Sequence, residues 1–167
     1  MIKITTILVL ILAFNSAVYS YELEARVTRL DYNVGKYADF DVNLYQVGVS
    51  KFYGNTGWSV MTGQSDKDTD KGLAGEVKNF WVMSVTQRFR LSNRFTLGTS
   101  LNYTEYKSVI DGRGNPDTDP GYGVSLISRL SQDLFIKLSY DDFYHKFNKS
   151  VGLETTRGAG LSIIYPF

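Results

Sequence analysis

Hydrophobic and polar residues alternate along most of the chain after residue 20. From Phe95 to Tyr103, apolar or aromatic residues occupy most of the odd positions, and glycine or small polar residues lie between them. A period of two residues is typical of a β-strand with one apolar and one polar face. The alternation recurs in other segments and predicts eight strands, at about 22–33, 38–53, 57–65, 76–91, 95–107, 121–131, 134–144 and 155–167.

The connections between the predicted strands alternate in length. Tight turns are predicted at 54–57, 92–94 and 131–133, and longer connections rich in charge, glycine and asparagine at 33–37, 66–75, 107–120 and 145–154. Short turns at one end and longer loops at the other are typical of outer-membrane barrels. The pattern therefore predicts an all-β fold, an eight-stranded antiparallel up-and-down transmembrane β-barrel with no unpaired edge.

The apolar face of these strands is predicted to meet lipid. Its aromatic residues stand near strand ends, as in the girdles of membrane barrels: Tyr45, Trp58, Phe89, Phe95, Tyr103, Tyr122, Tyr140, Tyr165 and Phe167. A soluble sandwich could use the same alternation, but strands of about ten residues match the length of a tilted spanning strand. The apolar residues of 40–44 have the opposite parity to those of 45–49, which predicts either a β-bulge or a strand leaving the membrane band.

Residues 1–20 have the pattern of a secretory signal peptide. Lys3 gives a positive start, 4–14 is apolar apart from two threonines, and small residues follow. The pattern predicts cleavage before Tyr21 and export of one barrel domain, residues 21–167. The alternative is a buried N-terminal strand or an uncleaved anchor, which the shortness of the apolar run disfavours.

Composition excludes several classes of protein. The 167 residues carry 18 Lys+Arg and 17 Asp+Glu, so the chain lacks the basic charge of a nucleic-acid-binding protein. Cysteine is absent, which rules out disulfides, thiolate metal sites and cysteine nucleophiles. After the N-terminus, no apolar run reaches the length of about 20 residues that a membrane-spanning helix needs. We expect no cofactor and no metal.

The last predicted strand carries the most specific signal. Leu161, Ile163, Tyr165 and Phe167 alternate to the end of the sequence. A terminal strand ending in Phe resembles the assembly signal that the barrel-assembly machinery takes up. With this strand and segments such as 94–103, residues 22–167 resemble the small eight-stranded outer-membrane barrels, the OmpA-like and OmpX/Ail-like group.

This resemblance implies a monomeric bacterial outer-membrane protein in contact with membrane lipid and lipopolysaccharide. The group includes structural proteins, adhesins, small pores and lipid-modifying enzymes, so the fold does not settle the function. We expect a non-enzymatic barrel that spans the outer membrane and presents four loops outside. The alternatives are a small-solute channel, a lipid A or phospholipid hydrolase, and a soluble β-protein.

Charged residues also occur on the predicted inward face. They are Glu24, Arg26, Arg88, Arg90, Arg129, Lys137 and Asp141. Eight strands leave an interior that side chains fill, and buried charges need partners. We therefore expect a salt-bridged plug in which the acidic members pair with the basic ones. The alternative is a gated pore lined by the same groups.

Two loop features could carry chemistry. Asp66, Asp68 and Asp70 have the alternating carboxylates of a calcium loop, but no glycine follows Asp70 directly, and we expect solvated side chains. His145 is the only histidine. Lipid A deacylases share the barrel topology and place a serine nucleophile soon after a histidine, whereas Phe147 stands at that place here, so we expect no catalytic site.

Overall fold

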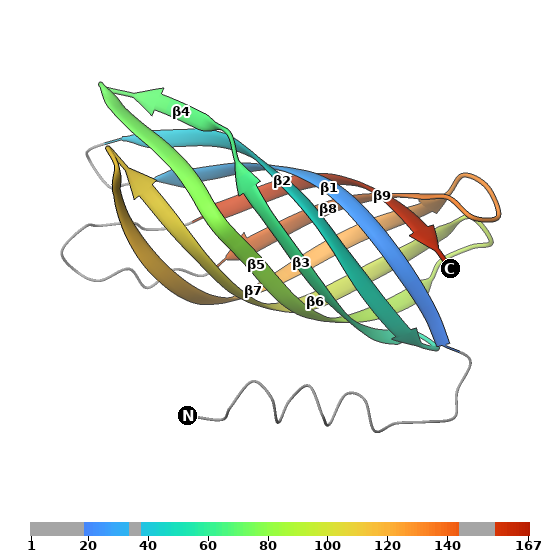
Figure 1. The fold of residues 1–167 in the computed structure, drawn as a ribbon. Helices are drawn as coiled ribbons and strands as arrows, with labels where there is room; N and C mark the ends of the chain where they lie inside the picture. Colours follow the sequence, from blue (N-terminus) through green and yellow to red (C-terminus); the bar gives the residue numbers. More distant parts are fainter. Residues whose placement is uncertain (1–18, 34–37, 144–155) are drawn as a thin grey trace, which may run out of the picture.

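The strands form one closed antiparallel sheet (Figure 1). The computed structural model describes residues 19–33, 38–143 and 156–167. Its strands are β1 (Tyr19–Asn33), β2 (Asp39–Tyr53), β3 (Thr56–Ser65), β4 (Lys67–Asp70), β5 (Leu73–Arg90), β6 (Phe95–Ile110), β7 (Arg113–Arg129), β8 (Phe135–Phe143) and β9 (Thr156–Pro166). No helix among these residues is long and apolar enough to cross a membrane.

Two pairings close the sheet into a barrel. β9 pairs with β1, and β3 pairs with β5. β4 continues the direction of β3 after a break at Asp66 and pairs with the first residues of β5. The two segments together make one strand of the barrel, so the predicted eight-stranded up-and-down barrel is confirmed.

Two of the predicted long loops are instead extended β-hairpins. β6 and β7 pair as far as Ile110 and Arg113, around the two-residue turn Asp111-Gly112. β4 and β5 pair as far as Asp70 and Leu73, around a turn in which Lys71 and Gly72 also have positive φ. Two central residues with positive φ match the tight turns that suit a hairpin. The prediction of loops at 66–75 and 107–120 is therefore wrong.

The predicted parity change within β2 is real, but no bulge causes it. β1 and β2 pair without a register shift from Tyr19 and Tyr53 to Asn33 and Asp39. In the first part of β2, before Tyr45, the apolar residues point into the barrel, and Asp41 and Asn43 lie on the other face. The predicted bulge is therefore wrong. The apolar side chains of β2 point into the barrel before Tyr45 and outward from Tyr45 to Val49.

Large apolar side chains cover the middle of the outer surface. Leu101 is 72% exposed and Leu138 is 56% exposed, although both belong to well-paired strands. Aromatic residues flank this band near the short turns, at Tyr21, Phe89, Phe95, Tyr165 and Phe167, and toward the other end, at Tyr45, Tyr103, Tyr122 and Tyr140. The outer surface therefore has the apolar band and two aromatic girdles of a membrane barrel.

Some predicted segments lie outside the described residues. They include residues 1–18 of the predicted signal peptide and most of the predicted connections at 33–37 and 145–154. β1 begins at Tyr19, two residues before the predicted cleavage point, and Ser20 pairs with Phe52.

Candidate functional site in the barrel lumen

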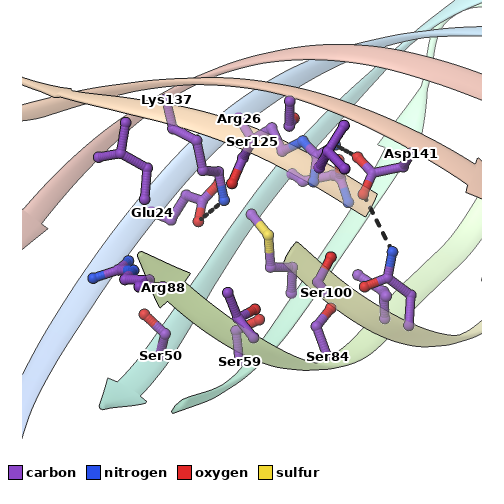
Figure 2. A pocket seen from close by; sticks show the side chains of 18 of the residues that line it. Glu24, Arg26, Ser50, Ser59, Ser84, Arg88, Ser100, Ser125, Lys137 and Asp141 are labelled. Carbon is purple, nitrogen blue, oxygen red and sulfur yellow. Dashed lines mark hydrogen bonds and ion pairs between the residues drawn. The ribbon is translucent and has the colours of Figure 1, made fainter. Parts of the chain in front are cut away.

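The middle of the lumen is polar and nearly filled. Figure 2 shows side chains from opposite walls converging on a cavity of about 50 Å³. Small hydroxyl side chains line much of it: Ser50, Ser59, Ser84, Ser100, Ser125 and Ser139. A space of this size holds a few water molecules at most. The lumen has no room here for a solute.

Two buried ion pairs lie in this polar region, and both join β1 to β8. Lys137 on β8 places Nζ 2.5 Å from Oε1 of Glu24 on β1, and Ser162 donates a hydrogen bond of 2.6 Å to the same carboxylate. Arg26 pairs with Asp141, which also accepts a hydrogen bond of 3.2 Å from the Asn102 side chain. The four charged side chains are at most 16% exposed. Each buried charge therefore has an opposite charge beside it, as burial requires.

A third ion pair lies nearer the short turns. Arg88 on β5 donates from Nη1 and Nη2 to the two oxygens of Glu22, at 2.6 and 2.7 Å. Its guanidinium lies 3.6 Å from the ring centroid of Phe52, in cation–π geometry. Ser50 donates a further hydrogen bond of 3.3 Å to Glu22. The pair closes the polar region at the end toward the short turns.

The structure brings together five of the predicted interior charges. Glu24, Arg26, Arg88, Lys137 and Asp141 contact one another or Glu22. Arg129 does not join them: it is exposed, and its Nε donates to the Ser131 carbonyl at 2.9 Å. Arg90 is likewise exposed and donates to Ser92 and Asn93 in the adjacent turn. Both arginines stand at strand ends, where water at the barrel mouth solvates them.

Sequence reasoning missed Glu22. Its signal was available, because Glu22 has the same parity as Glu24 and Arg26 on the first strand. With Glu22, the paired charges in the described lumen are three acidic and three basic side chains. The cluster, here called the lumen network, is therefore neutral.

An apolar cluster fills the lumen on the other side of the lumen network. It consists of Leu30, Ala38, Phe40, Val42, Leu44, Met61, Val77, Phe80, Val82 and Tyr106, with Leu73 and Ile110 packed against it. Phe40, Val42 and Leu44 are fully buried, and the rings of Phe80 and Tyr106 lie 6.3 Å apart. We call this cluster the apolar plug. Its side chains are buried against one another, as in a protein core.

The three aspartates of the partial calcium motif form hydrogen bonds with the backbone of a neighbouring strand. Asp66, Asp68 and Asp70 accept hydrogen bonds of 2.7, 2.9 and 2.9 Å from the backbone N–H groups of three alternate residues of β2. We call these three bonds the carboxylate ladder. In the described residues, no group of three or more acidic or histidine side chains is placed to hold a metal ion. The ladder joins β2 to β4 where the two strands have no main-chain pairing.

Comparison with known proteins extends the fold assignment. No protein-family model matches the chain, and no curated protein matches it in sequence. Among solved structures, the chain is similar to Neisserial surface protein A (TM-score 0.59, 12% identity, 89% of this chain and 95% of that one). It is also similar to the N-terminal β-barrel domain of Pseudomonas aeruginosa OprF (TM-score 0.62, 16% identity, 89% and 97%). A third similar structure is the attachment invasion locus protein Ail of Yersinia pestis (TM-score 0.60, 14% identity, 91% and 100%).

The chain is an eight-stranded outer-membrane β-barrel. The shared architecture and the apolar outer band, bounded by aromatic girdles, agree on this assignment. At 12–16% identity the similarity shows the fold of the outer-membrane barrel and leaves its activity open. His145, on which the hydrolase alternative depended, lies outside the described residues.

Proposed function

We propose that this outer-membrane barrel is a closed, non-enzymatic scaffold that presents its long hairpins at the cell surface. In outer-membrane barrels the short turns face the periplasm and the longer connections face outward. The β4–β5 and β6–β7 hairpins lie at the end opposite the C-terminus, where β4 projects beyond the barrel wall (Figure 1). This orientation puts both hairpins and the apolar plug on the outer side.

The apolar plug supports the hairpins as well as filling the lumen. Leu73 and Val77 belong to the β4–β5 hairpin, and Tyr106 and Ile110 belong to the β6–β7 hairpin. Because one packed cluster contacts both, the hairpins are anchored as extensions of the barrel wall. A rigid surface of this kind suits recognition of a partner, since little order has to be gained on binding.

The sealed lumen is the observation that carries the proposal. Each charge of the lumen network has an opposite charge beside it, and the apolar plug fills the lumen beyond the network. A channel would need a continuous hydrated path, which an eight-stranded barrel filled by side chains does not provide. The small-solute channel is therefore the less favoured function.

Planar-bilayer recording tests the sealed lumen. The purified full chain, with its insertion verified by flotation with lipid vesicles, is expected to show no steady open conductance at any voltage that the bilayer tolerates. A porin inserted in the same membranes is the positive control. A steady, open conductance from the wild-type barrel would contradict the proposal and favour the channel.

We also infer that the barrel-assembly machinery recognises the last strand through Leu161, Ile163, Tyr165 and Phe167. All four side chains face outward on or just after β9, and Phe167 donates its N–H to the Tyr21 carbonyl at 2.9 Å. The inference predicts that Phe167→Ala lowers the folded fraction in cells but leaves refolding into detergent unchanged. Equal loss in both settings would instead assign Phe167 a role in stability alone.

A further inference from the structure

We propose that the outer face beside β5 binds one phosphorylated, amide-acylated sugar lipid of the outer leaflet. The inference rests on the orientation given under the proposed function. The candidate site has three parts in order down the barrel wall. They are the lysine pair Lys78 and Lys107, the amide pair Gln64 and Asn79, and an apolar groove across β9, β1 and β2.

The lysine pair places two like charges side by side. Lys78 and Lys107 are direct partners in the β5–β6 register, and both are exposed. Like charges at opposed positions destabilise a sheet unless a counter-charge lies between them. Lys78 contacts Glu76 at 2.8 Å, whereas Lys107 has no ion pair or hydrogen bond within the described part of the chain. An anion that bridges the two ammonium groups would relieve their repulsion.

The neighbouring carboxylates do not cancel this charge. Glu76 also lies 3.9 Å from Lys67, so one carboxylate is shared by two lysines. Glu105 accepts hydrogen bonds from Trp81 at 2.9 Å and from the girdle residue Tyr103 at 3.4 Å. Three lysines thus face two carboxylates, immediately above the aromatic girdle. This is the level of lipid phosphate groups, where each basic side chain contributes about 1 kcal/mol of attraction to an anionic membrane surface.

The amide pair lies just below the lysines. The only register shift between paired strands in the described sheet falls between Lys78 and Trp81, and it turns Asn79 outward with φ of 51°. Gln64 is exposed on β3, opposite Tyr45. Neither side chain has a hydrogen-bond partner in the described part of the chain. Polar groups facing a membrane need partners, and amide linkages in a lipid would supply both donors and acceptors.

The groove continues from the amides into the apolar band. It is an open groove of about 720 Å³, lined by Ala25, Val27, Val47, Leu161 and Ile163, with Thr62 and the amide pair at its upper end. Ala25 makes the depression, because its paired neighbours Val47 and Ile163 are larger. An acyl chain fits such a floor. The proposed ligand has a phosphate, then an amide linkage, then an acyl chain. The site offers matching groups in the same order, which are the lysine pair, the amide pair and the apolar groove.

A glycerophospholipid matches the site less well. It offers one phosphate and ester linkages, whereas the site offers a pair of cations and two amide side chains. The test therefore measures binding of bisphosphorylated lipid A to the full chain in detergent micelles by native mass spectrometry. Dephosphorylated lipid A and phosphatidylglycerol are the comparison ligands.

The proposal predicts that Lys78→Gln/Lys107→Gln weakens lipid A binding about 30-fold, as expected when two interfacial cations are lost. Asn79→Gly keeps the positive φ and removes the amide, so binding is expected to fall about fivefold, the value of one hydrogen bond. Arg113→Gln removes a cation at the hairpin tip and is expected to bind like the wild type. Heat-modifiable gel mobility verifies that each variant is folded.

Three outcomes would overturn the inference. They are equal binding by the lysine variant and the wild type, equal binding of dephosphorylated lipid A, and equal or tighter binding of phosphatidylglycerol. Preference for lipid A that is lost in the lysine variant and kept in Arg113→Gln supports it. A barrel that conducts no ions and still shows no lipid preference would refute this inference and leave the proposed function standing.

Discussion

Arg88 and Glu22 lie on β5 and β1, which are not neighbours in the sheet, and they are joined by two hydrogen bonds of 2.6 and 2.7 Å across the lumen. If either residue were removed, the other charge would stay beside Phe52 and Ser50 without a counter-charge. The barrel thus links distant strands through its interior as well as through its main-chain ladders.

Removing Glu22 is therefore expected to destabilise the barrel. Glu22→Gln leaves Arg88 without its counter-charge and should lower the free energy of unfolding by about 3 kcal/mol, the lower part of the range for a broken buried pair. Urea unfolding in lipid vesicles measures the change. Arg29→Gln, which breaks an exposed ion pair, is the matched control and should cost much less than Glu22→Gln. Equal losses in the two variants would contradict this account of the lumen network.

The apolar plug predicts a second contrast. Phe40 is fully buried in the lumen, so Phe40→Ala should cost about 3–5 kcal/mol through the cavity that it leaves. Val47 lies on the same strand with its side chain 57% exposed on the lipid-facing surface. Val47→Ala should cost far less, because lipid chains replace the lost contacts. A larger cost for Val47→Ala would reverse the assignment of the two faces of β2.

The carboxylate ladder predicts a local effect on hydrogen exchange. Asp68→Ala leaves the Asp41 backbone N–H without its acceptor, so this amide should exchange roughly tenfold faster or more, as expected for loss of a charge-assisted bond. Asp68→Asn keeps a carbonyl oxygen and should retain most of the protection. Amide exchange by NMR measures both variants. Unchanged protection in Asp68→Ala would show that the ladder does not hold β2 to β4.

The stability of the barrel is expected to depend on pH through the ion pair between Arg29 and Asp41, which lies on the outer side of the aromatic girdle at Tyr45. The hydrogen bonds and charge of Arg29 hold the pKa of the Asp41 carboxyl below its ordinary value, although partial burial acts in the opposite direction. Because the pKa is lower in the folded state, the pair stabilises the barrel above the ordinary pKa of aspartate. This contribution is lost as the pH falls through the folded-state value.

Titration of Asp41 by carbon-13 NMR measures that pKa directly. In the wild type the carboxyl is expected to titrate at a lower pH than in Arg29→Gln, where the ordinary value should return. A Glu22→Gln barrel, altered far from this pair, should leave the Asp41 titration unchanged. Identical titrations in the wild type and in Arg29→Gln would rule out the pair as the cause.

The sequence predicted the fold well where strands cross the apolar band. Between Phe95 and Tyr103 lipid outside and side chains inside impose a strict period of two, and the alternation shows it. Beyond the band this constraint changes, because the outside of the wall meets water and the inside is dry. The hairpin residues at 66–75 and 107–120 therefore read as charged loops, although Asp111-Gly112 was a hairpin signal.

The sequence predicted most of the charged residues that face the lumen, but it did not predict which acid pairs with which base. Parity put Glu24 and Lys137 on the inward face, and the structure separates their charged atoms by 2.5 Å. Which acid meets which base depends on how far each strand is shifted along the barrel, and no single strand encodes that shift. The apolar plug was missed for a related reason, since its members come from five strands that only barrel closure brings together.

The most direct test of the account is the environment of consecutive residues on β6. Nitroxide labels placed singly at Thr99, Ser100, Leu101 and Asn102 in vesicle-inserted barrels report their contact with dissolved oxygen, which concentrates in lipid. We predict high oxygen accessibility at Thr99 and Leu101 and low accessibility at Ser100 and Asn102. The reverse alternation, or contact of Leu101 with a water-soluble relaxation agent alone, would contradict a barrel whose apolar face meets lipid.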